Sequence, residues 1–249
     1  MISFEASCNR MVTMEEKNQK NKGYYFAKVP GIQELYARFR SKDFDSKVKG
    51  KGLFQQRVSE EGWEGILGSK GQRASWLIDD DWAGPYEREL KDFMILIGPI
   101  WKDFVKKTQI DRHYNPDEYI VSMGVHRYNP DIKGEGLQAH CDDGILSILY
   151  SNEPLEGFID GKWVTISIPE DSVMVMTGQE TFLATKKPAL FHRVPHCERK
   201  KFSITAFIGA PSKNKIVVHE DIVITPGVVT IDNFRETLFA GKFRWDFKK

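Results

Sequence analysis

A change in hydrophobic periodicity near residue 118 divides this chain into two unlike parts. From there to residue 225, short runs rich in Val, Ile, Tyr, Phe and Thr stand between turn signals, as expected of a β core. The Asp160-Gly161 pair inside one of these runs predicts a hairpin turn. We expect strands at about 119–128, 138–142, 146–150, 158–165 (folded over that turn), 172–176, 189–194 and 201–209.

The part before residue 118 has helical patterning. A helix should begin after Gly84-Pro85, because proline suits the first helical turn, and Pro99 should kink it or break it into two pieces. A strand at 23–29 and a short helix beyond Pro30-Gly31 are also expected, with long loops and small elements over 41–84. Helices followed by strands predict an α+β fold. The stripe of the main helix comprises Leu90, Phe93, Met94, Ile97, Trp101, Phe104 and Val105.

Charge and cysteine content exclude several classes of protein. The chain has 36 Lys and Arg against 35 Asp and Glu, which disfavours a protein that binds nucleic acid or an anionic membrane surface. Three cysteines cannot build a disulfide framework, so a cytoplasmic location is expected. The longest apolar run, 93–101, is far shorter than the roughly 20 residues of a membrane helix. Residues 1–22 are expected to form a mobile tail and 23–249 a single domain, divided into 23–117, 118–225 and 226–249.

His140 and Asp142 form a candidate metal-binding pair. On a strand, residues i and i+2 share a face, so the two side chains should project together while Cys141 points away. Non-haem Fe(II) sites use two imidazoles and one carboxylate and leave positions open for other ligands. His192, in another expected strand, is the candidate third ligand.

Two other metal sites are weaker alternatives. His196 stands between Pro195 and a polar run that is typical of a turn, which favours a solvated histidine. A zinc site would need Cys141 and Cys197 beside the histidines, but strand alternation places Cys141 opposite His140. His113 and His219 are expected at the surface.

The last expected strand of the β core has one apolar and one polar face. Phe202, Ile204, Ala206 and Ile208 alternate with Lys201, Ser203 and Thr205. If the apolar face packs on the helix, the polar face lies inside the barrel. A buried ammonium is costly unless an anion pairs with it, so Lys201 beside Ser203 suggests a bound carboxylate.

Together these segments resemble the isopenicillin N synthase-like branch of the Fe(II)/2-oxoglutarate-dependent oxygenases. The resemblance begins at the helix over 85–108 and covers about half the chain. It implies a double-stranded β-helix, or jelly-roll core over 118–225, with flanking helices. It rests on HRYNP (126–130), GLQAHCDDGILSILY (136–150), GFIDGKWVTISIPEDSVMVMTG (157–178), FHRV (191–194) and KKFSITAF (200–207).

The resemblance assigns roles to individual residues. It implies that His140, Asp142 and His192 bind iron and that Tyr128 and Ser203 bind the cosubstrate 2-oxoglutarate. The family has Arg-x-Ser where this chain has Lys201-Phe202-Ser203, so Lys201 would clasp the distal carboxylate without the bidentate fork of arginine. Arg199 is an alternative on the same strand face. His126 stands where the family often has asparagine.

The implied reaction is oxidation of a small-molecule substrate by O2, with release of succinate and CO2. Because Asp142 keeps the carboxylate ligand, halogenation is disfavoured, while hydroxylation, desaturation and cyclisation stay open. The alternatives are an Fe(II) oxidase of the same fold that takes no 2-oxoglutarate and a non-enzymatic metal- or ligand-binding jelly roll. Candidate pocket contacts are Gln179, Glu180 and Arg193, with a substrate wall of Phe54, Gln55, Gln56, Arg57, Trp63 and Trp76.

Overall fold

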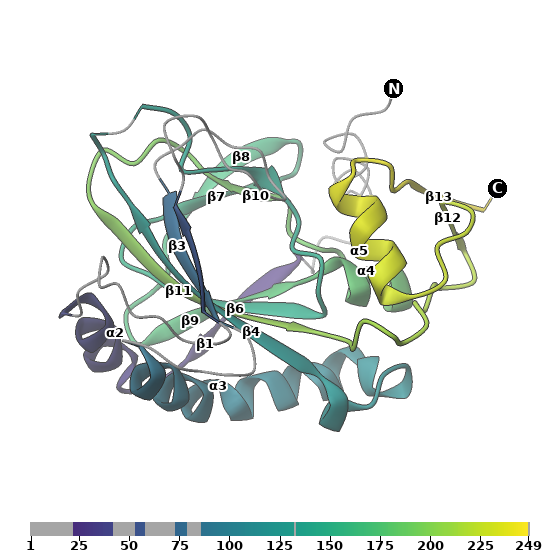
Figure 1. The fold of residues 1–249 in the computed structure, drawn as a ribbon, viewed down its shortest axis with the longest axis horizontal. Helices are drawn as coiled ribbons and strands as arrows, with labels where there is room; N and C mark the ends of the chain where they lie inside the picture. Colours follow the sequence, from purple (N-terminus) through teal and green to yellow (C-terminus); the bar gives the residue numbers. More distant parts are fainter. Residues whose placement is uncertain (1–21, 42–52, 58–72, 79–85, 132, 249) are drawn as a thin grey trace.

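A computed structural model describes residues 22–41, 53–57, 73–78, 86–131 and 133–248 (Figure 1). The expected tail over 1–22, apart from its last residue, and Trp63 lie outside these ranges. The expected domain limits therefore stay a prediction. Within the described ranges, the chain forms two β-sheets that face each other, helices on the outer side of the larger sheet, and a small C-terminal unit.

The larger sheet has seven antiparallel strands in the order β1-β9-β6-β11-β4-β3-β2. The central strands come from the part of the chain that alternates in hydrophobicity, whereas the edge strands come from the N-terminal part. The pair β2 and β3 lies in the segment expected to be mainly loops, and it extends the sheet beyond β4. The strands are β1 (Tyr24–Lys28), β2 (Leu53–Arg57), β3 (Arg73–Ile78), β4 (Ile120–Tyr128), β6 (Leu146–Ser151), β9 (Ser172–Thr177) and β11 (Lys201–Gly209).

The smaller sheet has four antiparallel strands in the order β5-β10-β7-β8. The predicted hairpin turn is confirmed, because Asp160 and Gly161 join β7 to β8 with positive φ values of 52° and 77°. The sheet faces β6, β9 and β11, and apolar side chains from both layers pack between them. This is the expected double-stranded β-helix. Its strands are β5 (Leu137–His140), β7 (Leu155–Ile159), β8 (Lys162–Ile166) and β10 (His192–Val194).

Two helices cover the outer face of the larger sheet, α2 (Ile32–Ser41) and α3 (Glu87–Thr108) (Figure 1). The predicted stripe is confirmed by the complete burial of Leu90, Phe93 and Ile97. Of the two outcomes expected at Pro99, the break is wrong, because α3 is one helix of 22 residues with Pro99 inside it, while the kink stays a prediction. Buried residues on both sides of Pro99 anchor the helix to the sheet, and this packing offsets the hydrogen bond that proline cannot donate.

Strand β11 sorts its side chains between the two layers as the alternation predicts. Phe202, Ile204, Ala206 and Ile208 belong to the core beneath the helices. Lys201, Ser203 and Thr205 are also buried, but they face the smaller sheet and line a pocket there. One strand therefore supplies both the helix-packing core and a polar wall between the sheets.

The C-terminal unit contains α4 (Gln179–Thr185), α5 (Ile231–Phe239), β12 (Ile222–Ile224) and β13 (Trp245–Phe247). Helix α4 was not predicted from the sequence. The expected helix near residue 233 is present, but the expected basic tail is partly wrong, since Trp245–Phe247 pairs with β12. The buried Trp245 packs on Phe182 of α4 at 4.8 Å between ring centroids, which draws the end of the chain into a core.

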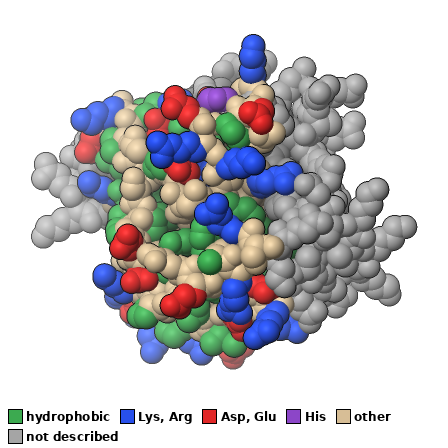
Figure 2. Space-filling view, turned by 90° about the vertical axis from the view of Figure 1, so that its left-hand side faces the viewer, with side chains coloured by type: hydrophobic (Ala, Val, Ile, Leu, Met, Phe, Trp, Pro, Cys, Tyr) green, Lys and Arg blue, Asp and Glu red, His purple; other side chains and the backbone are tan. Residues whose placement is uncertain are grey.

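In the described part of the chain, none of the helices combines the length and apolar character needed to cross a bilayer. Figure 2 shows Lys and Arg interspersed with Asp and Glu over the face that it presents. That mixture agrees with the nearly balanced charge of the whole sequence.

Candidate metal centre and adjoining pocket

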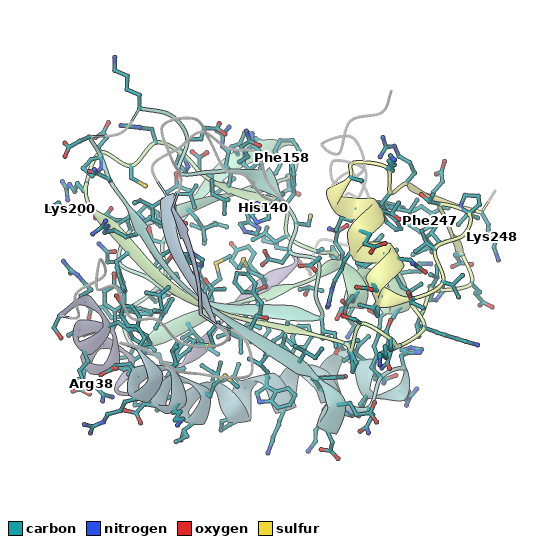
Figure 3. The ribbon with its side chains drawn as sticks, in the orientation of Figure 1. Arg38, His140, Phe158, Lys200, Phe247 and Lys248 are labelled. Carbon is teal, nitrogen blue, oxygen red and sulfur yellow. The ribbon has the colours of Figure 1, made fainter. Side chains whose placement is uncertain are left out.

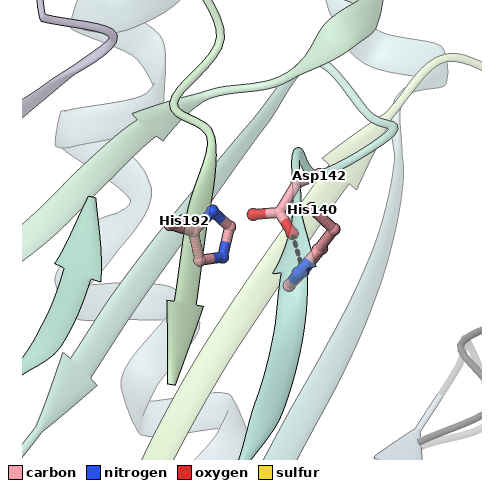
Figure 4. Close-up of side chains that lie close together, drawn as sticks. All are labelled: His140, Asp142 and His192. Carbon is pink, nitrogen blue, oxygen red and sulfur yellow. Dashed lines mark ion pairs between the residues drawn. The ribbon is translucent and has the colours of Figure 1, made fainter. Parts of the chain in front are cut away.

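The three predicted metal ligands lie together between the sheets (Figure 4). His140 is the last residue of β5, and His192 is the first residue of the neighbouring strand β10, directly opposite it. Asp142 follows two residues after His140. One ligand atom from each side chain lies within 4.8 Å of the others, and all three residues are buried. Among the described residues, this is the one group of three or more such side chains placed to hold a metal ion.

Asp142 reaches this position in a way that strand alternation did not predict. We expected the strand to include residue 142, but β5 ends at His140, and Asp142 lies in the turn that leads to β6. Its place is set by the main chain, because the N–H of Gln179 donates to its carbonyl at 2.9 Å. His140 and Asp142 therefore lie together as predicted, but the turn after β5, rather than alternation along a strand, brings the two side chains together.

Main-chain carbonyls orient both imidazoles. Nδ1 of His140 lies 2.8 Å from the carbonyl oxygen of Gln138, and Nδ1 of His192 lies 3.1 Å from that of Leu190. Because a carbonyl only accepts, each Nδ1 donates, and Nε2 is the atom left for a metal. Burial, reinforced by the charge of His140, lowers the pKa of His192 to about 4. This imidazole is therefore neutral at pH 7, the form that binds metal.

The carboxylate of Asp142 supports the metal interpretation. Burial alone raises the pKa of this carboxyl, but the interaction with His140 and the charges of His192 and His140 outweigh it and hold the pKa well below its ordinary value. Oδ1 lies 3.4 Å from Nε2 of His140, while the buried Oδ2 has no hydrogen-bond partner within the described residues. A buried, unpaired carboxylate oxygen is costly. A divalent cation bound by these two imidazoles and this oxygen would satisfy it, and the donor set fits Fe(II).

A pocket opens from this cluster along the inner face of the larger sheet. Tyr128, Lys201 and Ser203, predicted from the resemblance to bind an anion, all line it together with the three candidate ligands. Lys201 and Tyr128 are register partners on β11 and β4, and Nζ of Lys201 lies 5.5 Å from the ring centroid of Tyr128. The pocket thus has a cluster of metal-binding side chains and a buried cation on the same lining.

Lys201 is buried, with 2% of its surface exposed. Nζ donates a hydrogen bond of 2.7 Å to the carbonyl of Pro154, which uses one of its three donors. Burial lowers the pKa of this ammonium to about 8, against the opposing influence of Cys197 and Glu153. It is still largely protonated at pH 7, so an anion in the pocket would meet a desolvated positive charge.

The alternatives from the sequence fall outside this site. His196, Arg199 and Lys200 are exposed, and Figure 3 places Lys200 at the edge of the molecule and His140 between the sheets. Cys141 is buried in the apolar cluster around α4, so the zinc alternative loses a ligand. His113 is exposed as expected, whereas His219 is only partly exposed and lies near Asp221.

Three predicted pocket contacts are wrong. Gln179 and Glu180 are buried in the first turn of α4, where they contact the turn beyond Asp142, and neither lines the pocket. Arg193 alternates away from His192 and stacks on Trp163 at 4.2 Å from its ring centroid. For the expected substrate wall, the structure gives the backbone of β2 and β3 but does not describe their side chains.

The sequence reasoning missed most of the apolar lining. Val194 lines the pocket two residues after His192, and Phe207 lines it on the same strand face as Ser203, so period-two alternation from the predicted residues would have found both. Residues on other strands required the sheet register. The additional apolar lining residues are Leu137, Leu149, Leu155, Met176, Val194 and Phe207.

Comparison with known proteins supports the same interpretation. Residues 114–210 match the model of the 2OG-Fe(II) oxygenase superfamily. No curated protein matches the chain. Similar crystal structures include the dioxygenase for auxin oxidation in rice, with 16% identity and a TM-score of 0.66 over 96% of this chain and 92% of that one.

Two further structures share the fold. JOX2, crystallised with 2OG, Fe and JA, has 14% identity and a TM-score of 0.65 over 94% of this chain and 82% of its own. A full-length Neurospora crassa protein in complex with alpha-KG and thymine has 13% identity and a TM-score of 0.64 over 95% of this chain and 91% of its own. At these identities the likeness establishes the fold.

Proposed function

We propose that this chain is an Fe(II)/2-oxoglutarate-dependent dioxygenase of the 2OG-Fe(II) oxygenase superfamily and that it binds its iron through His140, Asp142 and His192. The observation that carries the proposal is their convergence: two imidazoles with Nε2 available and one carboxylate with an unpaired buried oxygen. Such a set occupies one face of an octahedral ion and leaves the other positions open.

Lys201, Ser203 and Tyr128 are proposed to hold 2-oxoglutarate. They line the same pocket as the triad, and the pocket's buried ammonium would pair with the distal carboxylate of this dianion. Lys201 takes the place of the family arginine in this scheme, while the exposed Arg199 takes no part. The single hydrogen bond to Pro154 holds the ammonium in place and leaves its other donors for the ligand.

The substrate is proposed to be a small molecule. When bound, Fe(II) and 2-oxoglutarate supply the activation of O2 that oxidises it, with release of succinate and CO2. The apolar lining, including Leu149, Met176 and Phe207, would exclude water. It would favour a substrate that places a C–H bond, rather than an ionised group, next to the metal. Hydroxylation, desaturation and cyclisation all fit this arrangement. The nearly balanced charge of the chain favours a small molecule over nucleic acid or a membrane surface.

The test is anaerobic visible absorbance of the apoprotein, titrated first with Fe(II) and then with 2-oxoglutarate. A metal-to-ligand charge-transfer band in the wild-type protein that disappears in His192→Ala supports the proposed ligands. The same titration of Lys201→Met should need far more 2-oxoglutarate. A band of normal intensity in His192→Ala would contradict the ligand assignment.

Product analysis completes the test. Wild-type protein with Fe(II), O2 and 2-oxoglutarate should release succinate, faster when a true substrate is present. Iron binding without the charge-transfer band, together with O2 consumption in the absence of 2-oxoglutarate, would instead indicate an oxidase that binds its substrate directly.

A further inference from the structure

The first turn of α4 holds the main chain that follows Asp142. The N–H groups of residues 178–180 together donate to all four carbonyls of residues 142–145, so the segment that begins at the proposed carboxylate ligand is hydrogen-bonded along its length. Gly178 makes this approach possible, because a Cβ at that position would overlap the carbonyl oxygen of Gly144. The bonds are Gln179 N to Asp142 O (2.9 Å), Glu180 N to Asp143 O (3.2 Å) and Gly144 O (3.1 Å), and Gly178 N to Ile145 O (3.0 Å).

The side chain of Glu180 links this turn to two other elements. It is completely buried. Oε2 accepts a hydrogen bond of 2.8 Å from the N–H of Ala210, just beyond β11, and Oε1 accepts one of 2.8 Å from Nη2 of Arg235 on α5. Burial raises the pKa of this carboxyl, while Arg235 and the N–H of Ala210 oppose the rise, and both oxygens accept hydrogen bonds as a carboxylate does. Glu180 is therefore a buried acid whose main-chain N–H bonds the turn over residues 142–145 and whose side chain binds Arg235.

Arg235 joins Glu180 to the neighbour of the proposed iron ligand. Its Nε lies 3.1 Å from Oδ2 of Asp143, and its Nη2 bonds Glu180 and lies 3.4 Å from the carbonyl of Ala210. The Arg235 side chain is 22% exposed, so it lies at the edge of the core, where its charge compensates those of Asp143 and Glu180. Gly209 leaves room for it, because a Cβ at residue 209 would overlap Nη2. One guanidinium thus bridges two carboxylates, from α4 and from the turn that carries Asp142.

We propose that Arg235 is a positioning residue for the metal site: through Asp143 and Glu180 it fixes the turn over residues 142–145, so that the affinity for the metal depends on helix α5. The inference rests on the proposed ligand triad and goes beyond it, since Arg235 itself is not a ligand. Without the guanidinium, the buried Glu180 carboxylate and the partly exposed Asp143 carboxylate lose their shared cation, so either the turn or α4 must shift. Either change moves the Asp142 carboxylate relative to the two imidazoles.

The test measures binding of Mn²⁺ alone to the full-length apoprotein by calorimetry, without 2-oxoglutarate, so the readout does not depend on turnover. Arg235→Met should weaken Mn²⁺ binding about 10- to 100-fold, the range seen when groups behind metal ligands are removed. Arg235→Lys should restore part of the affinity, because an ammonium can still pair with one carboxylate. Arg244→Met is the matched control: Arg244 lies in the same C-terminal part of the chain, but its guanidinium donates to the nearby carbonyls of Gly241 and Phe243.

Gly209→Ala tests the same inference with the charge of Arg235 retained, because the added Cβ displaces the guanidinium. This variant is the alternative test if Arg235→Met does not fold. It too should weaken Mn²⁺ binding, by about 10-fold. Mn²⁺ affinity within twofold of wild type in folded Arg235→Met or in Gly209→Ala would overturn the inference, even if the melting temperature falls. If His192→Ala also binds Mn²⁺ normally, the ligand triad itself fails; if His192→Ala alone loses binding, only the role of Arg235 fails.

Discussion

His192 lies directly opposite His140 across the antiparallel pair of β5 and β10, with their ring centroids 4.4 Å apart. The register shifts between residues 192 and 194, so the pairing is regular at the two histidines and irregular just beyond them. Nδ1 of each ring donates a hydrogen bond to the carbonyl two residues earlier in the sequence. The smaller sheet therefore supplies two of the three proposed metal ligands, and the turn after β5 supplies the third, the Asp142 carboxylate.

Removal of one ligand should abolish metal binding. His192→Ala or Asp142→Ala is expected to weaken Mn²⁺ or Fe(II) binding by more than about 100-fold, because a ligand contributes more than the groups behind it. His196→Ala, which removes an exposed histidine nearby, should bind metal as the wild type does. Calorimetric titration of the apoproteins checks this, and equal losses in the His196 and His192 variants would contradict it.

Loss of the buried ammonium should weaken binding of 2-oxoglutarate. Lys201→Met is expected to raise the Kd for 2-oxoglutarate about 10- to 100-fold, since a charge-assisted hydrogen bond contributes about 1.5–3 kcal/mol. Lys201→Arg keeps the charge and should stay close to wild type. The exposed Arg199 provides the control, and an increase in Kd in Arg199→Ala with none in Lys201→Met would reverse the assignment. The amplitude of the charge-transfer band against 2-oxoglutarate concentration gives each Kd.

Binding of 2-oxoglutarate should weaken as the pH rises through about 8. Burial lowers the pKa of Lys201 from its ordinary value to about 8 in the free protein, and only the protonated amine pairs with a carboxylate. Above that pH the affinity should fall by up to about tenfold per pH unit, because binding must then take up a proton. Lys201→Arg should remove this dependence, since a guanidinium stays protonated. Calorimetric titration of the Mn²⁺-loaded proteins with 2-oxoglutarate between pH 6.5 and 9 measures this dependence. A parallel decline in affinity in the wild type and in Lys201→Arg would exclude Lys201 as the cause.

Packing of α3 on the larger sheet should dominate its contribution to stability. Phe93 is completely buried, and Phe93→Ala should lower the free energy of unfolding by about 3–5 kcal/mol through loss of buried surface and the cavity left behind. Ile95, two residues further along the same helix, is 74% exposed. Ile95→Ala should change the free energy of unfolding by less than about 0.5 kcal/mol. Urea unfolding compares the two, and similar losses would mean that the helix does not pack as described.

Local patterns in the sequence were sufficient wherever a structural feature depends on neighbouring residues. The alternation of β11 predicted that Lys201 and Ser203 would share a buried face, and both line the pocket. The Asp160-Gly161 turn follows from the low cost of positive φ at these residue types. Pro99 shows the limit of this reasoning, because the rule about proline is local while the packing that keeps α3 whole is not.

The sequence alone determined the kind of site: residue types, spacing and the alternation of β11 indicated an Fe(II) site beside a buried cation, and the resemblance to a known family implied 2-oxoglutarate and a jelly-roll core. Only the tertiary structure decided what supports that site. Asp142 lies beyond the end of its strand, held by α4, and the buried Glu180 meets Arg235 from the far end of the chain. Periodicity describes which way a side chain points within one element. Contacts between elements depend on the tertiary packing of segments that are far apart in the sequence, and local periodicity does not specify that packing.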